Sequence, residues 1–141
     1  MLTLTIILDK QHEYVLMCYH EKQKMMNFIG GKSKELETPM AASYRELEEE
    51  TGITKDDVEL KFVRCEQVTT NANVVVPSNC WHMYVTVGII DDTQVELKEE
   101  KNPLTWISIA DLDTLIGRTT GYGNCYTYLR EAFDTLGLEY K

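Results

Sequence analysis

One helix with clearly marked ends constrains this chain more than any other segment. Thr38 suits the N-cap position, Pro39 suits the first helical position, and Gly52 is a typical stop at the C-terminal end. These signals predict a helix over Pro39–Thr51. On a helical wheel the segment presents a separate apolar face, made of Met40, Tyr44 and Leu47.

Three glutamates gather on another face of the same helix. Glu46, Glu49 and Glu50 fall within a stripe about 100° wide, with Arg45 beside them and one turn from Glu49. Like charges one turn apart are unfavourable, and acids in the last turns oppose the helix dipole. A divalent cation would compensate, and carboxylate oxygens favour Mg²⁺ or Mn²⁺. The helix alone leaves a second interpretation open, namely a solvated acidic face.

The rest of the chain mixes strands and helices without regular alternation. Apolar runs over residues 2–8 and 14–19, joined by a polar turn, predict an opening β-hairpin. Two longer strands are expected over 58–69 and 80–90, with a polar loop over 70–79 between them. Shorter elements follow: an extended piece over 104–107 and helices over 109–116 and 124–136. The pattern indicates a mixed α/β domain.

The net charge of the chain limits which molecules it is expected to bind. The chain has 141 residues with 14 Lys+Arg and 23 Asp+Glu, a net charge of −9, which argues against a nucleic-acid polymer. Its length fits one domain over residues 1–141, and no apolar run is long enough to span a membrane. The four cysteines form no C-x-x-C pair, and no basic leader opens the chain, so we expect reduced thiols and a cytoplasmic location. The sequence does not decide the oligomeric state, which is either a monomer or a homodimer.

The spacing around the helix decides between a metal site and a solvated face. It resembles the Nudix box, and all nine defined positions match: Gly31-x5-Glu37-x7-Arg45-Glu46-Leu47-x-Glu49-Glu50-x-Gly52-Ile53. A chance match somewhere in the chain is on the order of one in ten million. The resemblance implies an α/β/α sandwich (α+β) with a mixed central sheet. It also implies hydrolysis of a diphosphate linkage in a nucleoside diphosphate joined to another group, X.

The resemblance also implies roles for individual residues. The expected metal site consists of Glu46, Glu49, Glu50 and Gly31, with the three glutamates as ligands, and the metal would be Mg²⁺ or in its place Mn²⁺. Two further box residues are expected to support them: Glu37, which contacts metal-bound water or the ligands, and Arg45, which orients the glutamates. Lys32 is expected near the phosphates.

Two positions, one just before the box and one inside it, depart from what many members of the family carry, and the general base stays open. Many members have Pro and Gly where this chain has Ile29 and Leu36, which affects loop shape more than chemistry. The base is either a box glutamate or an acid on a later loop. Glu100 lies six residues before Trp106, where MutT-type members carry such an acid, and Glu99 is the adjacent alternative. A solvated turn is the other interpretation of this pair.

The most specific expectation is a MutT-like pyrophosphohydrolase of (oxidised) purine nucleoside triphosphates. Asn27 and Asn124 lie near positions where such enzymes carry base-contacting asparagines, and an amide both donates and accepts hydrogen bonds. Phe28 is one of several aromatic residues available for base stacking. The alternatives are a strand-end hydrogen bond for Asn27 and a helix cap for Asn124. Other substrates considered are ADP-ribose, dinucleoside polyphosphates and other nucleotide conjugates, and a remote alternative is an inactive nucleotide sensor.

Overall fold

The computed structural model describes residues 2–20, 25–69, 75–87, 104–112, 119–120 and 123–139. Six strands form the main sheet: β1 (Leu2–Ile6), β2 (Tyr14–His20), β3 (Met25–Lys32), β4 (Glu59–Thr69), β5 (Val75–Val87) and β6 (Leu104–Ser108). The helices are α1 (Pro39–Thr51), the 3₁₀ turn η2 (Ile109–Asp111) and α3 (Cys125–Thr135). A short two-stranded ribbon, β7 (Thr119–Thr120) and β8 (Gly123–Asn124), precedes α3.

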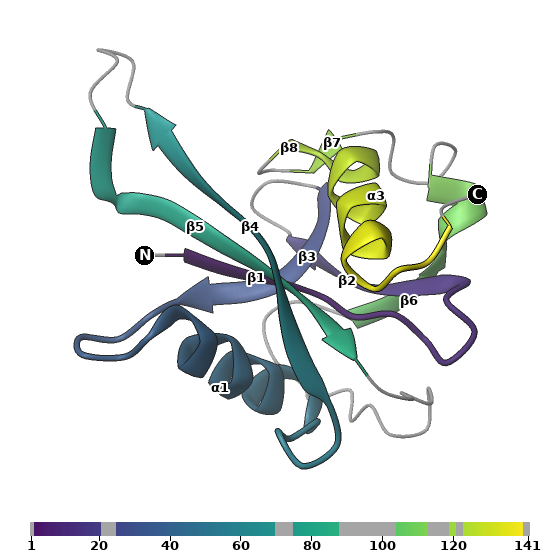
Figure 1. Ribbon diagram of the computed structural model, residues 1–141, viewed down its shortest axis with the longest axis horizontal. Helices are drawn as coiled ribbons and strands as arrows, with labels where there is room; N and C mark the ends of the chain where they lie inside the picture. Colours follow the sequence, from purple (N-terminus) through teal and green to yellow (C-terminus); the bar gives the residue numbers. More distant parts are fainter. Residues whose placement is uncertain are drawn as a thin grey trace.

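The main sheet is mixed, with the strand order β4-β5-β1-β3-β2-β6. Strand β1 runs parallel to β5, and the other four neighbouring pairs are antiparallel. The N-terminal strand is therefore a central one, with β5 on one side and β3 on the other (Figure 1).

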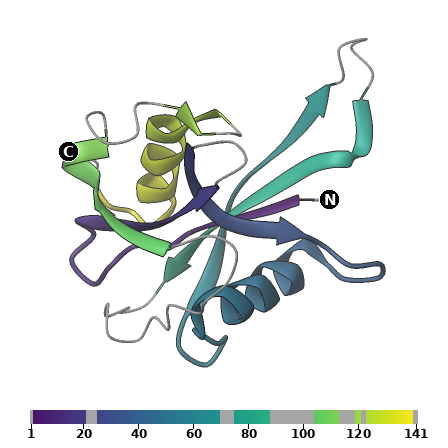
Figure 2. The ribbon, with the colours of Figure 1, turned by 180° about the vertical axis from the view of Figure 1, so that it is seen from behind.

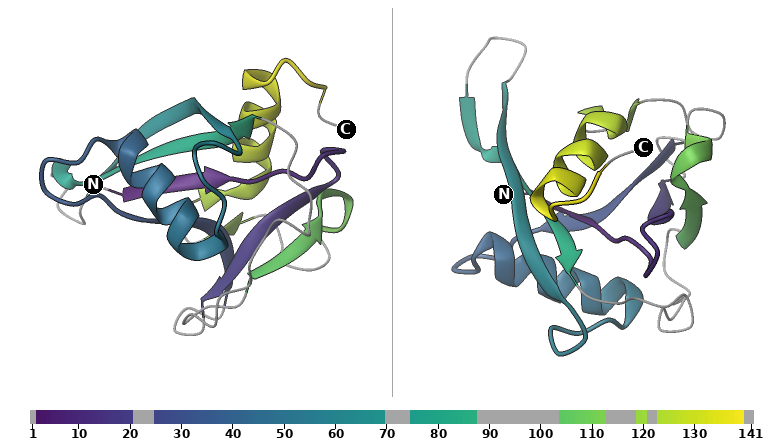
Figure 3. Two further views of the ribbon diagram at one scale, coloured as in Figure 1. Left: turned by 90° about the horizontal axis from the view of Figure 1, so that it is seen from below. Right: turned by 45° about the vertical axis from the view of Figure 1, so that its right-hand side comes forward.

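Two apolar clusters show that the two long helices cover opposite faces of this sheet. The clusters separate at the end of β1, where its last residue, Ile6, lies on the α3 side and the next residue, Ile7, lies on the α1 side. On one face, Leu129 and Phe133 of α3 pack in the first cluster, while Leu47 of α1 packs in the second. Figures 2 and 3 show this two-sided arrangement from behind and from two further angles. The predicted α/β/α sandwich with a mixed sheet is confirmed.

The local signals of α1 are confirmed at both ends. Thr38 Oγ1 accepts a hydrogen bond from the Ala41 N–H at 3.1 Å, and Gly52 ends the helix in the left-handed region at φ 79°. The predicted apolar face is wrong in part, because Met40 is 38% exposed and only Leu47 of the three is buried. The face that meets the sheet consists of Ala42, Ser43, Leu47 and Thr51. The glutamate stripe therefore borders the buried face instead of lying apart from it.

Two further predictions are corrected by the pairing of the strands. The expected hairpin of the first two strands forms only next to its turn, where Leu8 bridges Val15 and the Leu16 N–H donates to the carbonyl of Ile7 at 2.9 Å. Farther from the turn, β3 lies between β1 and β2. The expected loop over 70–79 is too long, because β5 already begins at Val75. The other expected elements within the described residues are confirmed, including β6, the start of η2 and helix α3.

Candidate active site

Arg45 is the centre of a charged network on α1. Its Nε and Nη2 donate to the two carboxylate oxygens of Glu37 at 2.9 and 3.0 Å, a bidentate pairing. Its Nη1 donates to Glu46 Oε1 at 2.9 Å and to Glu49 Oε2 at 3.2 Å. Nη2 also donates to the backbone carbonyl of Lys32 at 3.0 Å, which ties the helix to the end of β3. One guanidinium thus holds three box glutamates and one strand end together.

Glu37 is held at the turn that leads into α1. Besides Arg45, the backbone N–H of Lys34 donates to Glu37 Oε1 at 2.9 Å. The hydrogen bonds from Arg45, followed by the one from Lys34, lower the pKa of Glu37 to about 2. The same pairing with Glu37 raises the pKa of Arg45, so both groups stay ionised at any working pH. Glu37 therefore lies next to Arg45, with both of its carboxylate oxygens hydrogen-bonded.

Glu46 lies directly over Gly31, at the end of β3. A Cβ on Gly31 would come within 2.5 Å of the carboxyl carbon and Oε1 of Glu46. Only glycine at position 31 leaves the Glu46 carboxylate where it stands. Burial raises the pKa of Glu46, although the hydrogen bond from Arg45 opposes the shift.

The preceding glycine has a different role. A Cβ on Gly30 would collide with the backbone carbonyl oxygen of Thr3 in the neighbouring strand β1. Gly30 therefore allows two backbones to approach, whereas Gly31 makes room for a carboxylate. In the loop after β3, Leu36 has a φ of 67° and is fully exposed, so this position has the backbone geometry that favours glycine. This agrees with the family preference for Gly there and explains how the departure is accommodated.

Glu50 and Glu48 lie on opposite sides of the last turns of α1. Glu50 is partly buried and lies close enough to Cys18 of β2 to influence its thiol. Burial, with a smaller contribution from the Glu50 carboxylate, raises the pKa of Cys18 to about 11. Glu48 is exposed, as its position on the helical wheel predicts.

The chemistry of the donors fits a hard divalent cation. Glu46, Glu49 and Glu50 lie on the last turns of α1, and Glu46 lies against Gly31. Glu46 and Glu49 each use one carboxylate oxygen for Arg45 and have a second. Within the described ranges, no three His, Cys, Asp or Glu side chains converge on one point that could hold a metal ion. The nitrogen Nη1 of Arg45 lies between Glu46 and Glu49 instead. Metal binding by these residues therefore stays a prediction, which the donor set and the Gly31 cradle favour.

Asn27 is buried with an unused donor. It is 1% exposed, and its Oδ1 accepts from the backbone N–H of Phe28 at 2.9 Å. Its Nδ2 is buried and has no hydrogen-bond partner. Strand β3 pairs Asn27 with Cys18 of β2, on the face of the sheet that carries α1. The expected strand-end hydrogen bond is present, but it satisfies only the acceptor of this amide.

The remaining predicted substrate contacts are scattered. Phe28 is 1% exposed in the core beneath α3, so its ring packs against apolar side chains and we leave it out of the site. Lys32 is exposed at the end of β3, where its carbonyl and not its side chain is tied to Arg45. The backbone of Asn124 ends β8 immediately before α3, and its side chain lies outside the description. Glu100 and its neighbour Glu99 lie outside the described residues.

The sequence missed the backbone part of this site. Arg45 was expected to orient glutamates, and the structure adds the carbonyl of Lys32 and the N–H of Lys34. Every residue has a backbone carbonyl, so the residue types in a sequence do not indicate which carbonyl binds Arg45. The spacing of Gly31 and Glu37 around the loop is the nearest indirect signal.

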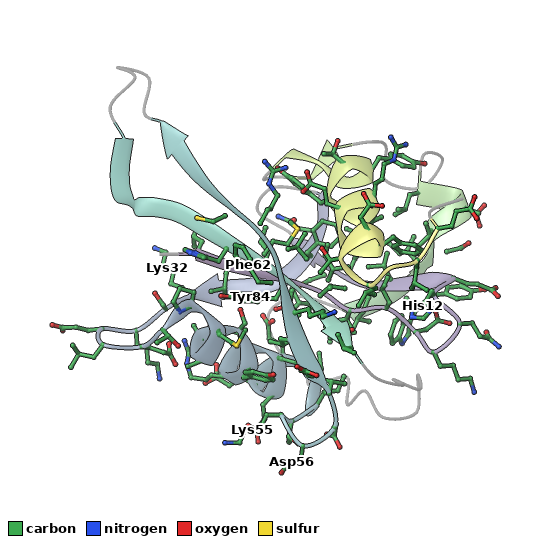
Figure 4. The ribbon with its side chains drawn as sticks, in the orientation of Figure 1. His12, Lys32, Lys55, Asp56, Phe62 and Tyr84 are labelled. Carbon is green, nitrogen blue, oxygen red and sulfur yellow. The ribbon has the colours of Figure 1, made fainter. Side chains whose placement is uncertain are left out.

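A cavity of about 530 Å³ lies elsewhere, at the other end of the molecule from Lys32. Its lining includes His12, Ile109 and Phe133, and the rings of His12 and Phe133 meet edge to face at 6.3 Å. Figure 4 shows His12 far from Lys32. The box carboxylates do not line this cavity. No helix in the described part of the chain is long and apolar enough to cross a bilayer.

Comparisons with known proteins agree with this geometry. The model of the NUDIX domain matches residues 3–128. A structure from work on MutT of Aliivibrio salmonicida and Vibrio cholerae has 22% identity and a TM-score of 0.68, and the match covers 94% of this chain and 96% of that one. An Ap4A hydrolase binary complex from C. elegans has 20% identity, a TM-score of 0.63 and coverages of 97% and 98%.

A third similar structure has a bound ligand. It is the NUDIX domain of NrtR from Shewanella oneidensis, complexed with ADP ribose, at 12% identity, a TM-score of 0.64 and coverages of 96% and 86%. No curated protein matches the sequence. The structural likenesses show the fold, and the domain match spans most of the sequence. The chain therefore belongs to the Nudix family of pyrophosphohydrolases.

Proposed function

We propose that the protein is a Mg²⁺-dependent, MutT-like pyrophosphohydrolase of (oxidised) purine nucleoside triphosphates, which releases a nucleoside monophosphate and pyrophosphate. The observation that carries the proposal is the Arg45 network, in which one guanidinium binds Glu37, Glu46 and Glu49, with Glu46 against Gly31. A merely solvated acidic face would not require a bidentate ion pair or a glycine under one carboxylate.

Glu46, Glu49 and Glu50 are the residues that would hold the cation, with Mn²⁺ as a substitute for Mg²⁺. A bound divalent cation supplies charge neutralisation at phosphate oxygens and a lower pKa for water in the site. The chain's own contribution is position: Arg45 and Glu37 fix the carboxylates before substrate arrives. Lys32, at the mouth of the box loop, supplies positive charge for the phosphates.

A box glutamate or Glu100 accepts the proton from the attacking water. Glu46 is the box carboxylate whose pKa burial raises, which makes it a better proton acceptor than Glu37 with its pKa near 2. Replacing Glu100 with Gln separates the two options, because only a base on the later loop would lose turnover while metal affinity stays normal.

Base recognition is assigned to Asn27 and Asn124. The unpaired Nδ2 of Asn27 supports this, because a buried donor without a partner is satisfied by an acceptor on a ligand. Asn124→Ala is expected to raise KM for oxidised dGTP more than for dATP. An equal effect on both, or only a loss of thermal stability, would favour a helix cap.

The alternative substrates are ADP-ribose, dinucleoside polyphosphates and other nucleotide conjugates, and the remote alternative is a sensor without activity. Structural neighbours include an Ap4A hydrolase and an NrtR domain with ADP ribose, so these alternatives have structural precedent. All box glutamates are present, which favours an active enzyme over a sensor. A single domain over residues 1–141, a cytoplasmic location and the choice of monomer or homodimer stay predictions.

The decisive experiment is a nucleotide panel with Mg²⁺, in which released pyrophosphate and phosphate are both measured. Pyrophosphate release with oxidised dGTP as the best substrate is the expected result. Higher kcat/KM for ADP-ribose or a dinucleoside polyphosphate would replace the proposed substrate, and binding without turnover would support a sensor.

A further inference from the structure

The cavity at the far end of the molecule from Lys32 is walled by three segments that are distant in sequence. The turn over residues 9–13 contributes His12 and Glu13, the start of η2 contributes Ile109, and α3 with the residues beyond it contributes Phe133 and Glu139. Figure 1 shows this turn, which joins β1 to β2, at the same end of the molecule as the end of α3. The volume of about 530 Å³ lies within the range of small-molecule sites. Since none of the box carboxylates lines it, the cavity is separate from the candidate active site.

Backbone hydrogen bonds hold the walls of this cavity together. The Glu13 N–H donates to Asp9 Oδ1 at 2.8 Å, and the Ile109 N–H donates to the Glu13 carbonyl at 2.9 Å. These two bonds fix the turn and join it to η2. The Leu138 N–H donates to the Phe133 carbonyl at 2.8 Å, which folds the chain beyond α3 back onto the last turn of that helix. The walls therefore stand without a ligand, so binding need not order them first.

The floor of the cavity is apolar. Ile109 and Phe133 are 7% and 5% exposed, and both belong to the apolar cluster beneath α3. The ring of His12 meets that of Phe133 edge to face at 6.3 Å and extends the floor toward the turn. His12 has a φ of 58°, a backbone conformation that is uncommon for a residue with a side chain. Such a floor suits the apolar body of a ligand, above all an aromatic one.

The charges around the floor are negative. Glu13 and Glu139 line the cavity from two different walls, and both are exposed. Neither carboxylate has an ion-pair partner among the described residues, and no Lys or Arg of the described part lines the cavity. The cavity also lies at the C-terminal end of α3, where the helix dipole is negative and the last turn has no basic residue. A positively charged ligand therefore complements the rim.

The arrangement fits an extended cation better than a metal ion. Within the described ranges, no three His, Cys, Asp or Glu side chains converge on one point that could hold a metal ion. We propose that this cavity binds an organic ammonium ion, a primary amine with an aromatic or alkyl body. The body lies on Ile109 and Phe133, and the ammonium group lies between Glu13 and Glu139. This site is independent of the carboxylates on α1 and of the proposed hydrolysis.

The first test is an NMR titration of the ¹⁵N-labelled protein without Mg²⁺ or nucleotide. The probes are 2-phenylethylamine and 2-phenylethanol, which share the ring and differ in charge. The amine is expected to shift the amide signals of His12, Ile109 and Leu138 and to bind about tenfold more tightly than the alcohol, because two carboxylates attract only the amine. Equal Kd values would show a merely apolar pocket and overturn the proposal. Shifts confined to α1 would place the amine on the box glutamates and overturn it as well.

Substitutions of the carboxylates test the rim. Glu13→Gln and Glu139→Gln are each expected to raise the Kd of the amine about threefold and to leave that of the alcohol unchanged. Both side chains are exposed and the backbone bonds of Glu13 do not involve its carboxylate, so folding is preserved. The matched control is Glu59→Gln on β4, which removes one exposed acid outside the cavity. An equal loss of affinity in the control would mean that the net charge of −9 attracts the amine, and the proposal would fail.

A third variant tests the cavity without changing any charge. Ala110 is exposed and lines the cavity, so Ala110→Phe would fill part of it with little effect on the fold. The expected result is loss of amine binding with well-dispersed amide signals elsewhere. Wild-type affinity in this variant would show that the amine binds outside the cavity. None of these measurements depends on turnover, so their failure leaves the proposed function intact.

Discussion

The two faces of the central sheet differ in what they bury. Beneath α3 the buried cluster is almost wholly apolar, from Leu4 and Ile6 of β1 to Leu129 and Phe133 of α3. On the side of α1, polar groups are buried as well. Strand alternation and the helix face place six buried polar residues there: Thr3, Thr5, Asn27, Ser43, Thr51 and Thr86.

The difference agrees with the proposal that the α1 side carries the chemistry and the α3 side the scaffold. Burial of a polar group is unfavourable unless it gains a hydrogen bond, and Asn27 Nδ2 and Ser43 Oγ have none. A face selected only for stability would avoid such groups. The α3 side offsets their cost with close apolar packing. Substitutions on the two sides should therefore fail in different ways.

The largest expected effect is on activity and comes from the α1 side. Glu49→Gln or Glu50→Gln is expected to lower Mg²⁺-dependent pyrophosphate release by about 1,000-fold or more, which is about 4 kcal/mol of transition-state stabilisation. The reason is the loss of a charged metal ligand in a fold that does not depend on it. Glu48→Gln, on the exposed side of the same helix, is the matched control and should keep wild-type turnover. Unchanged turnover in Glu50→Gln would refute the metal assignment.

On the α3 side the expected effect is on stability. Phe28→Ala should lower the free energy of unfolding by about 3 kcal/mol, because it leaves a cavity among fully buried side chains. The measurement is denaturant unfolding, paired with KM for a purine nucleotide. A large rise in KM without loss of stability would instead restore the stacking role that the sequence suggested.

Substitutions of the adjacent residues Gly30 and Gly31 should separate loss of stability from loss of activity. Gly30→Ala is expected to destabilise the fold by about 2 kcal/mol, because the new Cβ meets the backbone carbonyl of Thr3. Gly31→Ala meets only the movable carboxylate of Glu46, so it should weaken Mg²⁺ binding and turnover more than stability. Thermal unfolding and Mg²⁺ titrations of the two variants measure this. If both variants lost only stability, Gly31 would have no special relation to the carboxylate.

The smallest expected effect concerns acid stability and Glu37. Its pKa of about 2 in the fold lies below the ordinary value of 4.5, so the folded state binds this proton less readily than the unfolded state. The stabilisation is complete above pH 4.5 and is lost as pH falls toward 2. The measurement is the free energy of unfolding of the wild type and of Glu37→Gln in the presence of a metal chelator. The difference between the two values should shrink as pH falls from 4.5 to 2. A difference that does not change with pH would show that the ionised form of Glu37 adds no stability through its pairing with Arg45.

What the sequence predicted correctly was local. The bounds of α1 follow from Thr38, Pro39 and Gly52, whose effects act within one turn, and the structure reproduces all three. The proximity of Arg45 to Glu49 also follows from helix geometry. The family pattern contributed the fold, which no single segment specifies.

What the sequence predicted wrongly depends on distant partners. The apolar run that starts the chain suggested a hairpin along its whole length, but β1 itself pairs with β3 and β5, and hydrophobic alternation does not identify partners. Met40 was expected on the buried side of α1, but the helix leaves β4 partly uncovered there. Phe62 continues the alternation of Leu60, which marks a face of a strand but not whether a helix covers it.

The parallel pairing of β1 with β5 also has a consequence for the order of events during synthesis. The first strand sits in the middle of the sheet, and Leu8, two residues beyond its end, donates its backbone N–H to Thr86 Oγ1, 78 positions later. Contacts between residues so distant in sequence slow folding. On the ribosome, the row of paired residues from Gly31 through Thr3 to His82 therefore cannot be completed until β5 has emerged.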